Sequence, residues 1–186
     1  DSQSKVTEEE IKSIVQEGKE DGEVQEVEQD IVERVFLLGE LRVDDIMTQR
    51  NDIVWLDVDM TQCEVMEVLG GQLYDMYPVI AGKKGEVKGV ISLKDLVLNL
   101  NAPDFNLAGI VRQASYFPEN MSVYKALEKM KEQKISRALI CDEFGECQGI
   151  VTLRDILDAL LGAVNDSHKE PDIIKRINDD GWLVHL

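Results

Sequence analysis

Basic residues are scarce in this 186-residue sequence. Lys and Arg number 20 against 37 Asp and Glu, which leaves a net charge of −17. A surface this negative repels phosphate backbones and anionic lipid, so we expect neither nucleic-acid binding nor attachment to a membrane surface. One small anion can still be held by a local cluster of backbone N–H groups and a few basic side chains.

Cysteine and histidine are also few. Cys63, Cys141 and Cys147 show no repeated pair spacing, which favours a reduced, cytosolic setting over a disulfide framework. His168 and His185 lie far from any cysteine at zinc-finger spacing, so we expect no metal site. Both histidines lie in the terminal tail and no catalytic Ser–His–Asp or Cys–His set is arguable, so we do not expect an enzyme.

Long apolar runs are missing too. No stretch approaches the roughly 20 apolar residues that span a bilayer, and the N-terminus has no signal-peptide pattern. Asp1 is not an initiator Met, and the sequence stops at GWLVHL, inside a strand-like pattern. These ends predict a fragment of a longer protein, so the missing span says little about the parent protein.

The sequence does contain an internal repeat. Residues 89–97 (GVISLKDLV) and 149–157 (GIVTLRDIL) are identical or similar at every position, at an offset of 60. Upstream, residues 43–47 (VDDIM) lie over residues 107–111 (LAGIV) at an offset of 64. Such self-similarity indicates a duplicated structural unit.

Each copy predicts the order strand, helix, strand, strand, helix. First strands are expected at 53–56 and 115–117, and a T-x-x-E capping box at Thr61 begins the helix of the first copy. The closing helices are expected at 93–100 and 153–161. Because so few strands cannot stand alone, we predict an α+β (α/β-like) fold of two β-α-β-β-α repeats packed sheet to sheet. Amphipathic helices are expected before the repeats, at 7–18 and 24–38, and the first of them begins with a capping box at Thr7–Glu10.

The strand-to-helix junction of each copy carries the most informative residues, Ser92-x-x-Asp95 and Thr152-x-x-Asp155. A hydroxyl there can cap the helix and also meet a phosphate at the positive end of the helix dipole. The carboxylate one turn along can accept hydrogen bonds from both hydroxyls of a ribose, and Arg154 can add charge for phosphate. A capping motif alone explains one such pattern. Its repetition at equivalent places favours nucleotide binding at one or both sites.

The repeated unit ending in G-[IV]-[IV]-[ST]-x-x-D resembles the CBS domain, which works in pairs called Bateman modules. Residues 6–50 resemble the linker that follows the transmembrane domain in bacterial CorC/HlyC-type, hemolysin-related proteins, and residues 142–162 resemble the end of that family's second CBS unit. The resemblance implies a regulatory module that binds AMP, ADP or ATP and controls a magnesium/cobalt efflux-type membrane protein. It places the module at the cytoplasmic face of the inner membrane. The implied partners are a second copy, bound through the CBS repeats, and the transmembrane domain of the same chain.

The resemblance also assigns domains and site residues. Residues 1–42 would be a helical linker, 43–100 and 107–162 the two repeats, and 163–186 the truncated start of a transporter-associated domain. Ribose would meet Asp95 or Asp155, and phosphates would lie near Ser92 or Thr152. The adenine would lie beside Val54, Tyr77, Pro78 and Val79 in the first copy, or Tyr116, Ala138 and Leu139 in the second, with Thr48 and Arg50 of the MT-x-R element reaching across to the second site.

Three positions depart from the family pattern. Gln49 stands where the family often has Pro, and Arg154 and Ala163 each replace an acid. Arg154 adds a cation for phosphate but removes a ligand for Mg²⁺, so whether Mg²⁺ accompanies the nucleotide stays open. The main alternative function is a structural homodimerisation module with vestigial pockets. A membrane-lytic protein is a further alternative, which the acidic surface and the lack of a basic amphipathic helix disfavour.

Overall fold

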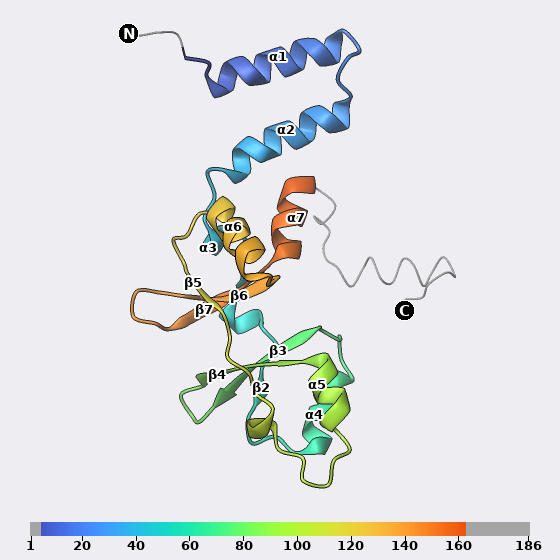
Figure 1. The fold of residues 1–186 in the computed structure, drawn as a ribbon, viewed down its shortest axis with the longest axis vertical. Coiled ribbons are helices and arrows are strands. Elements are labelled where there is room, and N and C mark those ends of the chain that lie inside the picture. Colours follow the sequence, from blue (N-terminus) through green and yellow to red (C-terminus); the bar gives the residue numbers. More distant parts are fainter. Residues whose placement is uncertain (1–4, 163–186) are drawn as a thin grey trace, which may run out of the picture. The chain divides into compact units, whose positions relative to one another are not determined.

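The computed structural model describes residues 5–162, and its elements follow the predicted order of two repeats behind two helices (Figure 1). The predicted start of a further domain at 163–186 lies outside the described residues. The helical elements are α1 (Glu8–Glu20), α2 (Glu26–Leu38), α3 (Val43–Ile46), η1 (Arg50–Asp52), α4 (Gln62–Leu69), α5 (Leu93–Asn99), η2 (Leu107–Gly109), α6 (Val123–Gln133) and α7 (Leu153–Leu161). The strands are β1 (Thr48–Gln49), β2 (Leu56–Asp57), β3 (Met76–Ala81), β4 (Glu86–Ser92), β5 (Tyr116–Pro118), β6 (Arg137–Cys141) and β7 (Cys147–Thr152).

The chain divides into two compact units. The helical unit comprises Asp1–Ile46, Asn120–Ser136 and Thr152–Leu186, as far as these are described, and holds α1, α2, α3, α6 and α7. The sheet unit comprises Met47–Glu119 and Arg137–Val151 and holds the strands with α4 and α5. Helices combined with small mixed sheets confirm the predicted α+β class.

Within the described residues, the strands form two small sheets, one for each repeat. In the first, with strand order β2-β3-β4, β2 runs parallel and β4 antiparallel to the central β3. In the second, with order β1-β7-β6-β5, β5 runs parallel to β6 and β1 antiparallel to β7. The inner strands β3 and β6 each have three consecutive buried residues. This pattern is typical of strands that are covered on both faces, whose sequences are continuous apolar runs.

Each repeat contributes its leading segment to the sheet of the other. Thr48 of β1 lies in the leading segment of the first repeat but pairs opposite Ile150 of β7, in the second. Reciprocally, Arg112 lies in the leading segment of the second repeat and bridges Val90 of β4, with N···O distances of 2.8 Å in both directions. The sequence predicts neither pairing, because segments of one or two residues are too short to show a hydrophobic period. Backbone hydrogen bonds therefore join the repeats in addition to the linker between them.

Glycines at equivalent positions of the two repeats make this exchange possible. A Cβ atom on Gly89 would lie 2.2 Å from the carbonyl oxygen of Arg112, and a Cβ atom on Gly149 would lie 2.2 Å from the carbonyl oxygen of Thr48. Gly89 also has a φ of 145°, which residues with side chains rarely adopt. The neighbour in each case is backbone, which cannot rotate aside. The repeated motif therefore begins with glycine for a steric reason.

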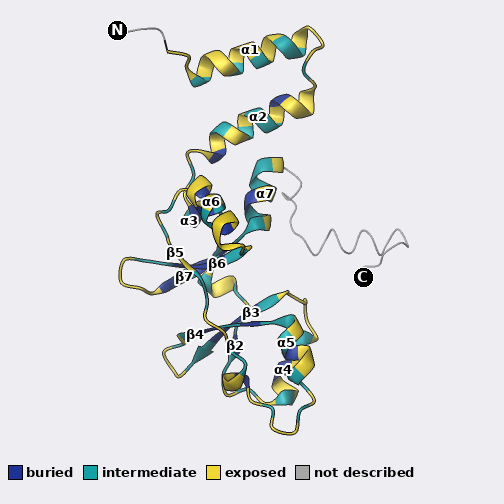
Figure 2. Cartoon of the chain, viewed as in Figure 1, coloured by how far each residue is buried: buried dark blue, intermediate teal, exposed yellow. Residues whose placement is uncertain are grey.

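The first repeat has its own buried core in the sheet unit (Figure 2). This core draws on β2, β3, β4, α4 and α5 and on η2 from the segment that follows. It therefore fixes the place where β4 ends and α5 begins. Its fully buried members are Leu56, Val65, Tyr77, Val79, Ile91, Leu96 and Leu107.

The helical unit is organised around α7, which contacts α2, α3 and α6. Helix α6 buries Val123, Ala126 and Met130, which lie on one face at helical spacing. Leu38 at the end of α2 and Ile156 in α7 are buried as well. Helix α1 begins with the predicted Thr7–Glu10 capping box and buries none of its own residues.

The first strand of the first repeat differs most from the prediction. A strand is expected at 53–56, but β2 covers only Leu56–Asp57 and follows the short helix η1. The indole N–H of Trp55 donates a hydrogen bond to the carbonyl oxygen of Arg50, at 3.2 Å. This bond turns the segment back on itself. A side-chain hydrogen bond of this kind leaves no trace in the apolar pattern, which explains the error.

We expect Gly149→Ala to lower the free energy of unfolding by about 1–3 kcal/mol, because the added methyl group must push β1 away from β7. Gly109→Ala is the matched control, since a Cβ there meets no atom within 4 Å. Its effect should stay below about 0.5 kcal/mol. Urea unfolding of both variants measures the difference, and equal losses would contradict the close approach of Thr48 to Gly149.

Candidate nucleotide site at the strand-to-helix junctions

The first junction lies where β4 passes into α5. Ser92 is the N-cap, and its Oγ accepts a hydrogen bond from the backbone N–H of Asp95 at 3.0 Å. The Asp95 carboxylate accepts a second bond from Nε of Arg112, with Oδ2 3.1 Å away. The Asp95 side chain is only 22% exposed, whereas that of Arg112 is 74% exposed. A partly buried carboxylate is thus paired with a guanidinium that stands mostly in water.

At the second junction, Thr152 and Asp155 cap α7 reciprocally. Thr152 Oγ1 accepts a hydrogen bond from the Asp155 N–H at 3.0 Å, and Asp155 Oδ2 accepts one from the Thr152 N–H at 2.9 Å. The exposed Arg154 lies 3.9 Å from the carboxylate of Asp158 instead. Across residues 5–162, no ion pair involves Asp155. The junctions share the capping hydroxyl predicted from the sequence and differ in what holds the carboxylate.

The Asp155 carboxyl is in an unfavourable environment for its charge. Burial raises its pKa above the ordinary value for aspartate, and the nearby Asp158 acts in the same direction. Hydrogen bonds from Thr152 and the charge of Arg154 lower the pKa but do not cancel the effect of burial. A buried carboxyl whose charged form is destabilised in the folded protein is typical of a functional site.

The residues predicted to surround adenine fall into two classes. In the first repeat Tyr77, Pro78 and Val79 of β3 are buried, and Tyr77 and Val79 belong to the core. The strand can form the floor of a site, while the side chains of Tyr77 and Val79 face the core. Val54 is 38% exposed and is therefore the member of this set that a base could contact directly.

The second repeat shows the same division. Ala138 and Leu139 of β6 are 3% and 1% exposed, whereas Tyr116 of β5 is 44% exposed. Burial raises the pKa of the Tyr116 hydroxyl, and the neighbouring thiols of Cys147 and Cys141 raise it further. The phenol therefore stays protonated at neutral pH and can donate a hydrogen bond.

Thr48 and Arg50 both contact β7 of the second repeat, and the guanidinium of Arg50 is already engaged. Its guanidinium donates to the carbonyl oxygen of Cys147 at 3.2 Å and to that of Gly85 at 2.7 Å. It also stacks over the Trp55 ring, 5.2 Å from the ring centre. Arg50 thus connects the turn between β3 and β4 with the start of β7. A role for it in nucleotide binding remains a prediction.

Sequence reasoning overlooked Arg112, which contacts the predicted ribose-binding carboxylate Asp95. A signal was available: the offset of 64 that aligns VDDIM with LAGIV also aligns Thr48 with Arg112. Thr48 was singled out as a residue that crosses to the other repeat. The same argument applied to its counterpart would have placed Arg112 beside the first junction.

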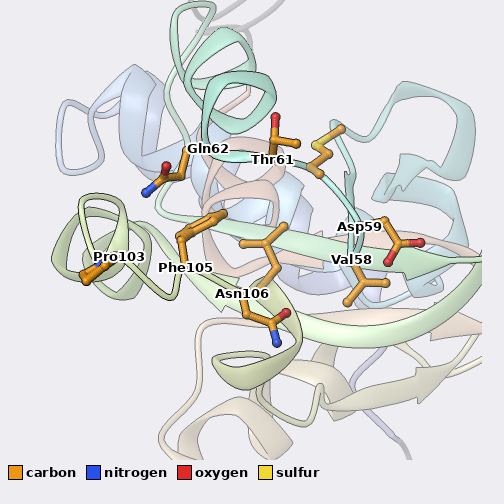
Figure 3. Close-up of a pocket in the computed structure, with 9 residues that line it drawn as sticks. Val58, Asp59, Thr61, Gln62, Pro103, Phe105 and Asn106 are labelled. Atoms are coloured by element: carbon orange, nitrogen blue, oxygen red, sulfur yellow. The ribbon is translucent and has the colours of Figure 1, made fainter.

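A separate pocket of about 390 Å³ lies at the start of α4 (Figure 3). Gln62 ties this helix to the linker between the repeats, because its side-chain amide donates to the carbonyl oxygens of Leu100 at 2.7 Å and Ala102 at 3.1 Å. The lining includes none of the predicted nucleotide-binding residues. It consists of Val58, Asp59, Met60, Thr61, Gln62, Pro103, Phe105, Asn106 and Leu107.

The described part of the chain lacks two kinds of feature. Between residues 5 and 162, no three His, Cys, Asp or Glu side chains are grouped closely enough to hold a metal ion. No helix in the same range combines the length and the apolar character needed to cross a bilayer.

Known relatives share the duplicated unit. The family model for the CBS domain matches residues 43–102 and 107–162. A UPF0053 protein of Synechocystis sp. is 35% identical over 184 residues, which cover 97% of this chain and 41% of the relative. The magnesium and cobalt efflux protein CorC of Escherichia coli (strain K12) is 28% identical over 179 residues, covering 94% of this chain and 61% of the relative. The chain thus spans between two fifths and about three fifths of the length of these relatives.

Solved structures agree with this relationship. The CBS domain of the bacterial CNNM/CorC family Mg²⁺ transporter matches with a TM-score of 0.76 and 28% identity, over 87% of this chain and 100% of that chain. The structure of such a domain in complex with ATP matches with a TM-score of 0.66 and 27% identity, over 74% and 99% of the two chains. These matches confirm the resemblance found in the sequence. The chain belongs to the CBS-domain family, as a tandem CBS pair like those of CorC/CNNM-family Mg²⁺ transporter-like proteins.

Proposed function

We propose that this tandem CBS pair binds an adenine nucleotide (AMP, ADP or ATP) and thereby controls a divalent-cation (Mg²⁺/Co²⁺) transport-related membrane protein, without catalysing a reaction. The observation that carries the proposal is the duplicated junction, where a capping hydroxyl and a carboxylate recur at equivalent places. The complex of a related CBS domain with ATP supports the choice of ligand. The proposed location is the cytoplasmic face of the bacterial inner membrane, beside the transmembrane domain of the longer chain.

The chemistry of each junction suits a nucleotide. The N-terminus of α7 offers the positive end of the helix dipole to a phosphate. The backbone N–H groups of Leu153 and Asp155 already donate to the carbonyl oxygen of Ser136 and to Thr152 Oγ1. Asp155 can accept hydrogen bonds from ribose hydroxyls, which would stabilise its charged form and offset the cost of burial. The exposed faces of Tyr116 and Val54 are available to a base in their respective repeats.

Helix α7 offers a route from a ligand to the N-terminal helices. Thr152 and Asp155 lie at its start, and the helix contacts α2 within the helical unit. At its other end, a Cβ atom on Gly162 would lie 2.3 Å from Nε of Arg34 in α2, so the two helices approach closely there. A nucleotide that favours one position of α7 would therefore bias the position of α2. Through α2 the change would reach the transmembrane domain proposed to precede it.

We also propose a homodimer formed through the CBS repeats. Apolar side chains are exposed on the short helices of both repeats: Met66 in α4 is 57% exposed, Leu98 in α5 is 70% exposed, and Leu161 in α7 is 55% exposed. Exposed apolar groups on helices are typical of surfaces that another chain covers. A second copy presents the same groups, as a two-fold interface requires.

The first test is isothermal titration of AMP, ADP and ATP, each with and without Mg²⁺. We expect saturable binding, weakened about tenfold or more at the first site by Asp95→Ala and at the second by Asp155→Ala, because each change removes the acceptor for the ribose. Asp104→Ala removes an exposed carboxylate and serves as the control. No heat with any nucleotide, in folded and ligand-free protein, would contradict the proposal and leave a structural homodimerisation module with vestigial pockets.

The dimer is tested by sedimentation velocity. We expect the wild type to sediment as a dimer and Leu98→Asp to sediment as a monomer, because a charge in an apolar interface would be desolvated. Leu73→Asp is the matched control, since this leucine is 58% exposed but lies in the loop after α4. A monomeric wild type, or a dimer that survives Leu98→Asp, would contradict the proposed interface.

Asp155→Asn should stabilise the protein at neutral pH. Asparagine retains an oxygen for the Thr152 N–H but carries no charge. Because burial raises the folded-state pKa of Asp155, the folded protein holds this proton more tightly than the unfolded chain does. The stability contributed by the protonated form is therefore lost as pH rises through the unfolded and then the folded pKa.

The wild type and Asp155→Asn should converge below the ordinary pKa of aspartate, about 3.9. Urea unfolding across that range and up to neutral pH measures the gap. Asp158→Asn, on the same helix, should show no such gain. A wild type more stable than Asp155→Asn at neutral pH would show that the charge of Asp155 is favourable in the fold.

A further inference from the structure

Arg112 is held in place by its backbone and not by its side chain. Its N–H and C=O groups bond to Val90 at 2.8 Å each, and the missing side chain of Gly89 lets it approach β4 this closely. Val90 lies two residues before Ser92, so the backbone of Arg112 is fixed beside the first junction. Its side chain then extends to Asp95 and stays 74% exposed.

The two junctions differ at this position. The exchange of leading segments places Thr48 opposite Ile150 in the second repeat as it places Arg112 opposite Val90 in the first. Threonine has neither the length nor the charge of arginine. The ion pair between Arg112 and Asp95 therefore belongs to the first repeat alone within the described chain.

We propose that Arg112 makes the first site selective for phosphorylated ligands. This inference rests on the proposed function and concerns the same junction. A ribose that binds Asp95 must share or replace the hydrogen bond from Arg112. A nucleoside without phosphate offers the guanidinium no new partner, so its binding loses the ion pair without compensation. A nucleotide offers phosphate oxygens, with which arginine forms strong, often bidentate hydrogen bonds.

The exposure of Arg112 makes this exchange of partners feasible. An ion pair with a mostly exposed partner is weak, because water screens it and the long side chain gains freedom when it is released. Asp95 is on the first turn of α5, and Ser92, the proposed phosphate contact, caps the same turn. A guanidinium that leaves Asp95 therefore remains close to the first turn of α5 and to the Ser92 hydroxyl that caps it.

The test compares the affinities of ATP and adenosine at the first site. Titrations use Asp155→Ala protein, so that the remaining binding reports the first repeat. Adding Arg112→Thr, which copies the residue of the other repeat, should weaken ATP and tighten adenosine, lowering the ratio of the two affinities about tenfold or more. Arg112→Lys keeps the charge and should retain most of the ratio. Unfolding curves check that both variants fold.

Three outcomes would overturn the inference in distinguishable ways. If the wild type binds no nucleotide, the proposed function fails and this inference fails with it. If the wild type binds ATP but the first site binds neither ligand in the Asp155→Ala background, the proposed function stands and the selectivity of the first site does not. If both ligands bind there and Arg112→Thr leaves the affinity ratio unchanged, Arg112 has no part in selectivity.

Discussion

The close approach of backbone at Gly89 and Gly149 is the constraint on which the rest of the structure depends. Because no Cβ atom intervenes, the leading segment of each repeat can hydrogen-bond to the last strand of the other. That strand runs directly into the helix that carries the capping hydroxyl and the carboxylate. The same contact thus decides which residue each repeat receives from the other. The first repeat receives Arg112, which reaches Asp95, and β7 of the second repeat receives Thr48.

The two junctions stabilise their helices in the same way and treat their carboxylates differently. Ser92 and Thr152 both accept a bond from the backbone three residues on, so the fold of each repeat needs the hydroxyl. Asp95 has a cationic partner, whereas Asp155 accepts a hydrogen bond from the backbone N–H of Thr152 and has a raised pKa. Duplication has preserved the capping geometry while the electrical environments of the two sites have diverged.

The sequence predicted the features that have a period or a local motif. The closing helices, the capping boxes at Thr7 and Thr61 and the capping roles of Ser92 and Thr152 all follow from neighbours within four residues, and the structure confirms them. Contacts between distant segments could not be predicted this way. The pairing of β1 with β7 and the ion pair between Asp95 and Arg112 join residues whose relation appears only after folding. The burial of Tyr77 and Val79 likewise depends on the complete core.

The two hydrogen bonds of Arg50 affect which sequence changes the repeats can tolerate. Its two hydrogen bonds go to the carbonyl oxygens of Gly85 and Cys147, so every residue type at position 147 would present the same acceptor. The turn at Gly85, with φ of 67°, favours glycine but the bond itself does not require it. The planar guanidinium donates to two acceptors at once from separate nitrogens. A lysine has a single nitrogen and does not reproduce this geometry. Position 147 can therefore change in residue type without loss of the hydrogen bond by which Arg50 connects the two repeats.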